Sequence, residues 1–251
     1  MQRTLVVMPT YNEAQNIHEI VAAVLARPVG VDLLIVDDGS PDGTGDLADL
    51  LADGEPRLRV LHRTSKSGLG SAYRAGLGQG LDEGYEILVE MDADLSHPPE
   101  ALDALIAATS EHDLVLGSRY VTGGGVQNWP WYRRALSSGG NRYVRLATGM
   151  PLGDATSGFR AFRRDVLETI NIRELRSEGY SFQLEAALVT WRAGFSIAEV
   201  PITFVERTAG ASKISRSIVL EALWRVLWWG IRGPRGPERM HVRSVTSTTG
   251  G

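Results

Sequence analysis

The 251-residue sequence contains no cysteine. Disulfide bridges, Cys-ligated zinc, iron–sulfur clusters and cysteine nucleophiles are therefore excluded. The P-loop pattern G-x-x-x-x-G-K-[ST] and the nucleophile pattern G-x-S-x-G are also missing, and Gly68-Leu69-Gly70 lacks the dinucleotide-binding spacing. The five histidines have no spacing typical of metal ligands.

Long hydrophobic runs are absent as well. The N-terminal apolar run is about five residues long and ends at Pro9, which is too short for the core of a signal peptide. Ile218–Ile231 is about 14 residues long and is interrupted by Glu221 and Arg225, whereas a membrane-spanning helix needs roughly 20 residues. We therefore expect a cytoplasmic protein.

Charge is distributed unevenly along the chain. Residues 1–118 hold 20 acidic and 7 basic residues, whereas residues 207–251 hold 2 and 8. An acidic half is compatible with a metal site, and a basic end with phosphates or an anionic membrane surface, although solvated helix faces explain such charge equally well. The net charge of −4 argues against nucleic acid as a partner.

Short apolar segments alternate with helix-like segments in the first 118 residues. The expected strands are Thr4–Met8, Leu33–Val36, Leu58–Leu61, Ile87–Met91 and Leu114–Gly117. The expected helices are Ala14–Ala26, Gly43–Ala52, Gly68–Glu83 and Pro99–Ser110. This alternation predicts an α/β fold with a largely parallel sheet and helices on both faces, in which ligands bind beyond the carboxyl ends of the strands.

The rest of the chain is less regular. Residues 119–137 are rich in Gly and Trp and predict a long loop, and a helix is expected from Leu136 to Thr148. Ile197–Val205 alternates as a single strand. A final amphipathic helix is expected over residues 215–232 and a disordered tail over residues 233–251, so that residues 1–232 form one domain.

The segment MDADLSHPP at 91–99 directly follows a predicted strand. Side chains two residues apart in extended backbone point the same way, so Asp92 and Asp94 can converge. Two carboxylates at a strand end suit Mg²⁺ or Mn²⁺, with water and substrate phosphates as the other ligands. Pairs of this kind also occur in ordinary turns, so the motif alone is weak evidence.

Two further motifs stand at predicted strand ends. VDDGSPDGT places Asp37 and Asp38 before a tight turn, where an acid could hold a ribose hydroxyl or a base edge. MPTYNE places Tyr11 beside a nucleobase in the functional interpretation and brings Glu13 within reach of a donor group. Turn and cap chemistry is the plainer explanation of both motifs.

Basic residues recur in the predicted loops of the second half. Arg matches phosphate geometry through parallel hydrogen bonds, so these positions are candidates for phosphate contacts, and surface solvation is the alternative for each one. They are Arg119, Arg133, Arg134, Arg207 and Lys213.

Taken together and in this order, the motifs resemble polyprenol-phosphate mannosyltransferases, also called dolichol-phosphate mannose synthases, of the inverting glycosyltransferase family two. KSGLGSAYRAG at 66–76, GSRYVTGGG at 117–125, NWPWYRR at 128–134, SGFRAF at 157–162, GYSFQLE at 179–185 and RTAGASKIS at 207–215 add to the motifs above. The resemblance covers roughly residues 4–220. It implies a GT-A fold and transfer of mannose from GDP-mannose to a polyprenyl phosphate.

The resemblance also implies roles for individual positions. Those expected around the guanosine are Pro9, Tyr11, Glu13, Val36 and Asp38. Those expected to hold the metal and diphosphate are Asp92, Ala93 and Asp94, with Ser96 where many relatives carry a Gln ligand. Those expected to hold the acceptor phosphate are Arg119, Arg133 and Ser137, and those on the donor diphosphate are Arg207 and Lys213.

An acceptor that is already anionic needs little help from a base, so no catalytic base is expected. The predicted C-terminal helix places Leu223, Leu227 and Trp228 on one stripe, which suggests peripheral binding at the cytoplasmic membrane face; core packing is the alternative. A separate membrane-embedded partner protein could assist. Two other functions stay open: another donor such as UDP-glucose, or another acceptor, on the same fold, and a non-catalytic sugar-nucleotide-binding subunit.

Overall fold

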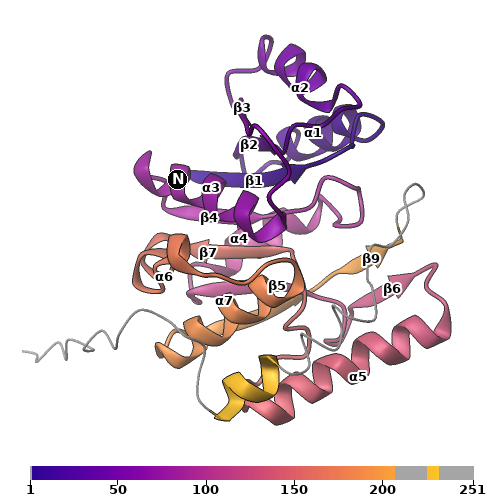
Figure 1. Cartoon of the computed structure of the whole chain (residues 1–251), viewed down its shortest axis with the longest axis vertical. Helices are drawn as coiled ribbons and strands as arrows, with labels where there is room; N and C mark the ends of the chain where they lie inside the picture. Colours follow the sequence, from indigo (N-terminus) through magenta and orange to yellow (C-terminus); the bar gives the residue numbers. More distant parts are fainter. Residues whose placement is uncertain (1, 207–224, 232–251) are drawn as a thin grey trace, which may run out of the picture.

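The computed structural model describes residues 2–206 and 225–231. A seven-stranded sheet has the order β3-β2-β1-β4-β7-β5-β8 (Figure 1). Its strands are β1 (Thr4–Thr10), β2 (Asp32–Asp37), β3 (Leu58–His62), β4 (Ile87–Glu90), β5 (Leu114–Ser118), β7 (Arg160–Arg163) and β8 (Ile197–Pro201). All neighbours are parallel except that β7 runs antiparallel between β4 and β5. The predicted α/β class with a mostly parallel sheet is confirmed.

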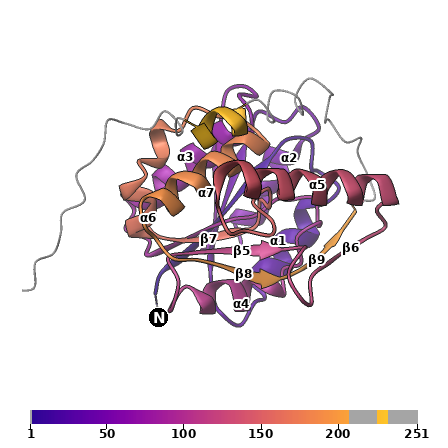
Figure 2. The ribbon, with the colours of Figure 1, turned by 90° about the horizontal axis from the view of Figure 1, so that it is seen from below.

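Helices cover both faces of this sheet (Figure 2). One face packs against α1 (Ile17–Leu25), α2 (Thr44–Ala52) and α4 (Ala101–Ala108). The other packs against α3 (Leu69–Asp82), α6 (Arg164–Thr169), the 3₁₀ turn η1 (Ile172–Glu174) and α7 (Tyr180–Arg192). Successive strand residues serve opposite layers: Leu33 and Ile35 pack on the first face, Leu34 and Val36 on the second.

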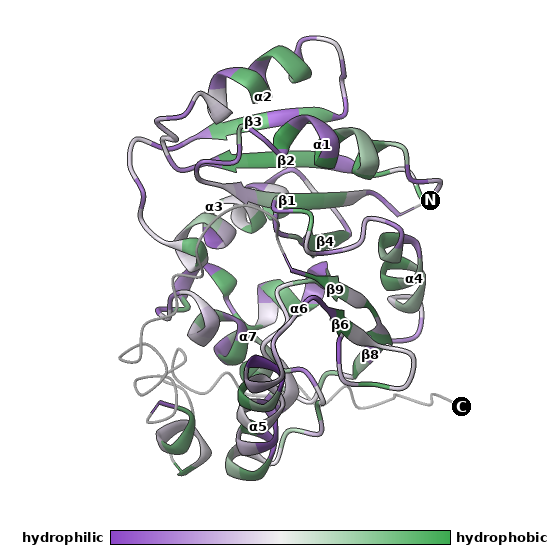
Figure 3. Cartoon of the chain, turned by 90° about the vertical axis from the view of Figure 1, so that its right-hand side faces the viewer, coloured by the Kyte–Doolittle hydropathy of each residue, from purple (hydrophilic) through white to green (hydrophobic). Residues whose placement is uncertain are grey.

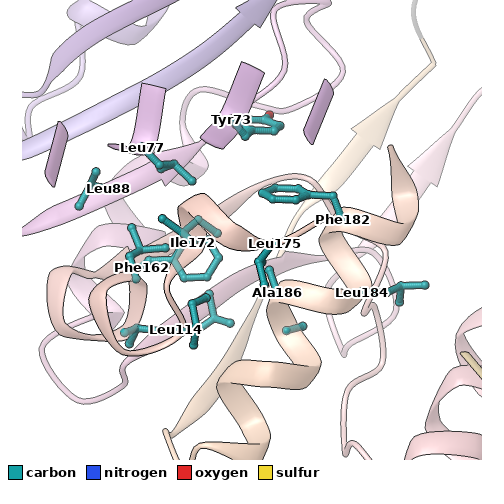
Figure 4. Packing of buried hydrophobic residues seen from close by; sticks show 14 of the residues in the cluster. Tyr73, Leu77, Leu88, Leu114, Phe162, Ile172, Leu175, Phe182, Leu184 and Ala186 are labelled. Carbon is teal, nitrogen blue, oxygen red and sulfur yellow. The ribbon is translucent and has the colours of Figure 1, made fainter. Parts of the chain in front are cut away.

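Helix α3 lies unusually close to the sheet because it carries glycine where it faces the strands. A Cβ on Gly76 would meet Val7 Cγ1 at 2.4 Å, and one on Gly80 would meet Leu88 Cδ2 at 2.6 Å. Tyr73 lies on the same side of α3, and its ring stacks on that of Phe182 of α7 at 6.1 Å (Figure 4). The close approach brings the Tyr73 hydroxyl to the end of β4.

The loop predicted over residues 119–137 is wrong in part. It contains strand β6 (Gly125–Gln127), which pairs with β9 (Thr203–Val205), and helix α5 (Trp131–Thr148) begins within it. The single strand predicted over residues 197–205 is divided between two sheets. Ile202 separates the parts: its N–H bonds the Ser118 carbonyl and its carbonyl accepts from the Gly125 N–H, so alternation continues while the strand changes partner.

Residues 225–231 form a helical segment that packs beside α5 and α7. Val226 and Trp229 are buried in the core, and Arg192 Nη2 donates to the Trp229 carbonyl at 2.8 Å. The predicted helix over residues 215–232 therefore lies partly outside the described residues, and the tail over residues 233–251 lies wholly outside them. The role of the helix at a membrane stays a prediction. Figure 3 shows α5 alternating between hydrophobic and hydrophilic residues, unlike the hydrophobic strand β2.

Candidate active site

A cavity of about 370 Å³ opens at the carboxyl ends of β1, β2 and β4. Strands of one direction deliver their terminal side chains to the same edge, as the topology rule for open α/β sheets requires. The cavity is lined by Pro9, Thr10, Tyr11, Glu13, Asp38, Lys66, Gly68, Leu69, Ala72, Asp92, Ala93, Asp94, Thr156, Gly158, Gly179, Tyr180 and Gln183.

One end of the cavity pairs an acid with basic and aromatic groups. Asp38 Oδ1 accepts from Arg63 Nη1 at 2.7 Å, and its other oxygen accepts from the Ser67 N–H at 3.3 Å. Lys66 Nζ lies 3.8 Å from the centre of the Tyr11 ring. This end offers a flat ring and a fixed carboxylate, the groups expected to bind a nucleoside.

The two acids of the VDDG motif have different tasks. Asp37 accepts from the Thr10 hydroxyl at 3.0 Å and from the Ser40 N–H at 3.0 Å, so it holds the turn together. Asp38 lines the cavity. The side chain of Val36 is fully buried between the sheet and α3 and does not line the cavity, so the structure does not bring it to the predicted nucleoside site.

The two carboxylates that follow β4 are held by different donors. Tyr73 donates its hydroxyl proton to Asp92 Oδ1 at 3.0 Å. The Ser96 hydroxyl and N–H both donate to Asp94 Oδ1, at 2.5 and 3.1 Å, across a turn in which Leu95 has φ = +61°. A non-glycine residue in this region of φ is uncommon and is found where a site dictates the backbone.

The buried side chain of His97 holds the same loop in place. Its Nδ1 accepts from the Asp92 N–H at 3.1 Å, its ring stacks on Phe159 at 5.2 Å, and the side chain is almost fully buried. Its other nitrogen, Nε2, lies 3.9 Å from Asp92 Oδ2. His97 therefore fixes the backbone of Asp92 and lies close to its outer oxygen, a task that the histidine spacing did not reveal.

The donor chemistry of this loop fits a hard divalent cation. Asp92 and Asp94 supply oxygen ligands, and both face open cavities where phosphate oxygens and water could complete an octahedron. No group of three or more His, Asp or Glu side chains in the described part of the chain could hold a metal alone. The Ser96 hydroxyl is engaged with Asp94, and direct ligation by Ser96 stays a prediction.

A second, smaller pocket of about 70 Å³ adjoins the first. The two share five wall residues, so they meet at the carboxylate pair: Asp92, Asp94, Thr156, Gly158 and Tyr180. The small pocket is otherwise lined by Ser96, His97, Arg119, Trp129, Arg133, Ser157, Phe204 and Glu206. A Cβ at Gly158 would lie 3.6 Å from Asp92 Oδ2 and would narrow the junction.

Arg119 forms a buried ion pair at the base of the small pocket. Its Nε and Nη2 donate to the two oxygens of Asp154, both at 2.6 Å, and Nη2 also donates to Thr156 Oγ1 at 2.9 Å. Burial opposes charge on both groups, but the mutual hydrogen bonds prevail, so the pKa of Asp154 is lowered and the pKa of Arg119 is raised. The pair is ionised and fixes the guanidinium.

Arg133, near the start of α5, lines the rim of the same pocket. Its guanidinium carbon lies 4.3 Å from the centre of the Trp129 ring, and Nη1 donates to both carboxylate oxygens of Glu206. Ser137 follows one helical turn later and lines neither pocket; its carbonyl accepts from Asn141 Nδ2 at 3.2 Å. The structure therefore brings together Arg119 and Arg133, but not Ser137.

A fully buried polar layer lies beneath the carboxylate pair. Arg160 donates to the carbonyls of Ser157, Ala155 and Gln183. Facing Arg160 across the ladder, Glu90 has no hydrogen bond of ordinary geometry among the described residues, and burial raises its pKa to about 7. Burial also lowers the pKa of Arg160 to about 10.

The predicted residues Pro9, Tyr11, Glu13, Asp38, Asp92, Ala93 and Asp94 meet in the larger cavity, and Ser96, Arg119 and Arg133 in the smaller one. Arg207 and Lys213 lie outside the described residues. Sequence reasoning did not single out Lys66, Tyr73, Thr156 and Tyr180. Lys66, Tyr73 and Tyr180 stand inside quoted motifs, and Thr156 directly precedes one, but no motif by itself shows which of its residues reach the site.

These features define an α/β fold of the sugar-nucleotide-binding type, with an acidic loop at the carboxyl end of β4 beside the cavity. The sequence model described as glycosyl transferase family 2 matches residues 5–170, and the chain belongs to that family.

Within the family, the predicted resemblance to polyprenol-phosphate mannosyltransferases is confirmed. The chain is 54% identical over 247 residues to a polyprenol monophosphomannose synthase of Mycolicibacterium smegmatis, covering 96% of this chain and 92% of the relative. It is 48% identical to an undecaprenyl-phosphate mannosyltransferase of Micrococcus luteus, covering 91% and 94%. A dolichol-phosphate mannosyltransferase of Pyrococcus furiosus is 36% identical, covering 89% of this chain and 63% of that one.

Solved structures share the fold at lower identity. Glucosyl-3-phosphoglycerate synthase of Mycobacterium tuberculosis, in complex with Mn²⁺, UDP and product, gives a TM-score of 0.62 at 20% identity, covering 92% of this chain and 78% of that one. A mannosyltransferase of Pyrobaculum calidifontis in complex with GDP-mannose and Mn²⁺ gives 0.61 at 20% identity, covering 94% and 66%. At this identity the likeness establishes the GT-A fold.

Proposed function

We propose that the protein transfers mannose from GDP-mannose to a polyprenyl phosphate, with Mg²⁺ or Mn²⁺, giving β-mannosyl phosphate and GDP. The observation that carries the proposal is the junction of a nucleoside-sized cavity with an arginine-bearing pocket at Asp92 and Asp94. Relatives that cover nearly the whole chain carry names of this activity. The donor enters the larger cavity and the acceptor phosphate the smaller one.

The chemistry is a single displacement at the anomeric carbon. An oxygen of the acceptor phosphate forms the new bond, and the bond to the donor's β-phosphate oxygen breaks with its electron pair leaving on GDP. One displacement inverts an α-linked donor to a β-linked product, and no proton has to move, since the acceptor is already anionic. Neither a catalytic base nor a covalent enzyme intermediate is required.

The residues at the junction position the two substrates. Asp92 and Asp94 would hold a divalent cation, which when bound would offset charge on the departing diphosphate. Arg119 and Arg133 hold the acceptor phosphate in line and offset its repulsion from the donor phosphates. Arg207 and Lys213 remain predicted phosphate contacts, and Tyr11, Glu13 and Asp38 remain predicted nucleoside contacts.

A membrane surface has to present the acceptor's lipid tail. In the described residues, no helix combines the length and apolar character needed to cross a bilayer. The outer side of α5 exposes Trp131, Tyr132, Leu136 and Leu146, and α5 carries four arginines and no acidic residue. Exposed aromatic and aliphatic groups beside arginines suit an anionic lipid surface. We infer peripheral binding at the cytoplasmic face, with a membrane-embedded partner protein as an optional addition.

A transfer assay tests the proposal. Purified protein is incubated with radiolabelled GDP-mannose, a polyprenyl phosphate and Mg²⁺ or Mn²⁺, and label is counted in the organic phase. We expect lipid-bound label that EDTA abolishes. Label from UDP-glucose and none from GDP-mannose would support the alternative donor, and binding of GDP-mannose without any transfer would support a non-catalytic subunit.

A further inference from the structure

Both arginines of the small pocket already contact a carboxylate. Arg119 is paired with Asp154 and Arg133 with Glu206. Among the residues that the structure describes, an acceptor phosphate that enters this pocket therefore meets no guanidinium free of a carboxylate contact. How firmly each carboxylate is held decides which arginine the phosphate can take over.

The Arg119–Asp154 pair is permanent. Asp154 is fully buried and also accepts from the Arg119 N–H at 3.0 Å, while its own N–H donates to Glu199 at 2.9 Å. Separating these charges would leave a buried carboxylate without its partner, which is strongly unfavourable. Arg119 can bind a phosphate only while it stays paired with Asp154.

The Arg133–Glu206 pair, by contrast, is partly exposed and can separate. Each side chain is 25% exposed, and Glu206 follows the last residue of β9, with its N–H on the Gln127 carbonyl at 3.3 Å. Water can solvate the carboxylate as soon as it leaves Arg133, so the pair contributes little to stability. The contact is therefore exchangeable.

We propose that Glu206 is an internal competitor of the acceptor phosphate. Its carboxylate occupies Arg133 in the empty pocket, yields it to the incoming phosphate and retakes it after transfer. The inference rests on the proposed function and deepens it, because it assigns a role in substrate exchange to a residue outside the predicted site. Glu206 acts through Arg133 and is a positioning residue, not a catalytic one.

The charge change of the reaction gives this competition a direction. A phosphomonoester has a second pKa near 6 and carries close to two negative charges at neutral pH, which outweigh the single charge of Glu206. The product is a phosphodiester with one negative charge and one esterified oxygen, so it holds Arg133 less firmly than the substrate does. Glu206 regains Arg133 more readily from product than from substrate and thereby favours release.

The Glu206→Gln variant tests the proposal with a short-chain prenyl phosphate as acceptor and its mannosyl phosphodiester as product inhibitor. Removing the competing charge lowers the acceptor KM and the product inhibition constant, each by about fivefold, the most that a partly exposed ion pair contributes. The kcat falls as well, because release becomes slow. Glu83→Gln is the matched control: Glu83 pairs with Arg59, is 29% exposed and lies away from both pockets.

A residue that only orients Arg133 would give the opposite sign for the acceptor, since its loss would raise the KM. A raised or unchanged KM in Glu206→Gln, with transfer retained, therefore overturns the proposal. A second measurement uses wild-type protein and needs no variant. Calorimetry with bound GDP should find that the phosphodiester product binds several-fold more weakly than the phosphomonoester acceptor. Equal affinities would overturn the proposal. Wild-type protein that transfers no mannose at all would instead contradict the proposed function.

Discussion

Tyr73 donates its hydroxyl proton to Asp92 Oδ1 at 3.0 Å, joining a fully buried helix side chain to the carboxylate at the junction of the two pockets. Burial, followed by the Asp92 charge, raises the pKa of Tyr73 well above its ordinary value, so the phenol stays protonated and remains a donor. A carboxylate held in this way keeps one oxygen fixed and presents the other to the pocket.

Removing the Tyr73 hydroxyl should weaken metal binding more than it weakens folding. In Tyr73→Phe the ring still stacks on Phe182, while Asp92 loses its orienting hydrogen bond. Loss of such a partner typically costs about tenfold or more in metal affinity or activity. We expect about a tenfold rise in the Mg²⁺ or Mn²⁺ concentration needed for half-maximal transfer. Tyr85→Phe, which removes a partly buried hydroxyl bond to Asp32, is the control, and an unchanged metal dependence in Tyr73→Phe would refute this role.

Acid should remove the stability that the ion pair between Asp154 and Arg119 contributes. The pKa of Asp154 is lowered in the folded protein, so its contribution to stability is complete above the unfolded value of about 3.9 and is lost as the pH falls through the folded value. Asp154→Asn removes this contribution at every pH and costs about 3–5 kcal/mol near neutrality. Urea unfolding from pH 3 to 7 measures both effects.

The control for that series is Asp103→Asn, which breaks a partly exposed pair with Arg27 and should cost about 1 kcal/mol or less. Equal losses of unfolding free energy in Asp154→Asn and Asp103→Asn would show that the buried pair stabilises the fold no more than the partly exposed pair does.

Glu90 should make the protein less stable as the pH rises toward neutrality. Burial raises its pKa from 4.5 to about 7, so the folded protein keeps a proton that the unfolded chain releases between these values. Stability therefore falls over this range, by up to about 3 kcal/mol. Glu90→Gln, measured in EDTA by thermal unfolding, should match wild type near pH 5 and exceed it at pH 8. A variant that follows the wild-type pH profile would contradict this prediction.

The exposed face of α5 should govern vesicle binding. Trp131 is 80% exposed and Tyr132 61% exposed, and their rings meet edge to face with centroids 6.3 Å apart. We expect the double variant Trp131→Ser/Tyr132→Ser to bind anionic liposomes about tenfold more weakly in flotation. Leu50→Ser, on α2 with 69% exposure, is the matched control. Flotation of the double variant at the wild-type level would place the membrane contact elsewhere.

Residues at strand ends were predictable because a strand's direction and period follow from the sequence. Asp38, Asp92 and Asp94 stand directly after apolar runs, and a parallel sheet brings such ends together. Val36 shows the limit: Asp38, two residues later, lines the cavity, but the side chain of Val36 is fully buried in the core.

The partners of those residues were not predictable in the same way. Asp154 and Glu206 come from loops whose position depends on β7 entering the sheet antiparallel and on β9 leaving it to pair with β6. No local pattern encodes either event. The change of strand partner at Ile202 could not be seen in the sequence, because apolar and polar residues keep alternating through it.

The proposed mechanism requires Asp92 and Asp94 for mannosyl transfer to a lipid phosphate. The most direct measurement is the initial rate at which label from GDP-mannose enters polyprenyl phosphate, compared among wild type, Asp92→Asn, Asp94→Asn and the surface control Asp113→Asn. We predict metal-dependent transfer by wild type and the control and a loss of at least a hundredfold in the two site variants. Transfer that survives in both site variants would contradict the account.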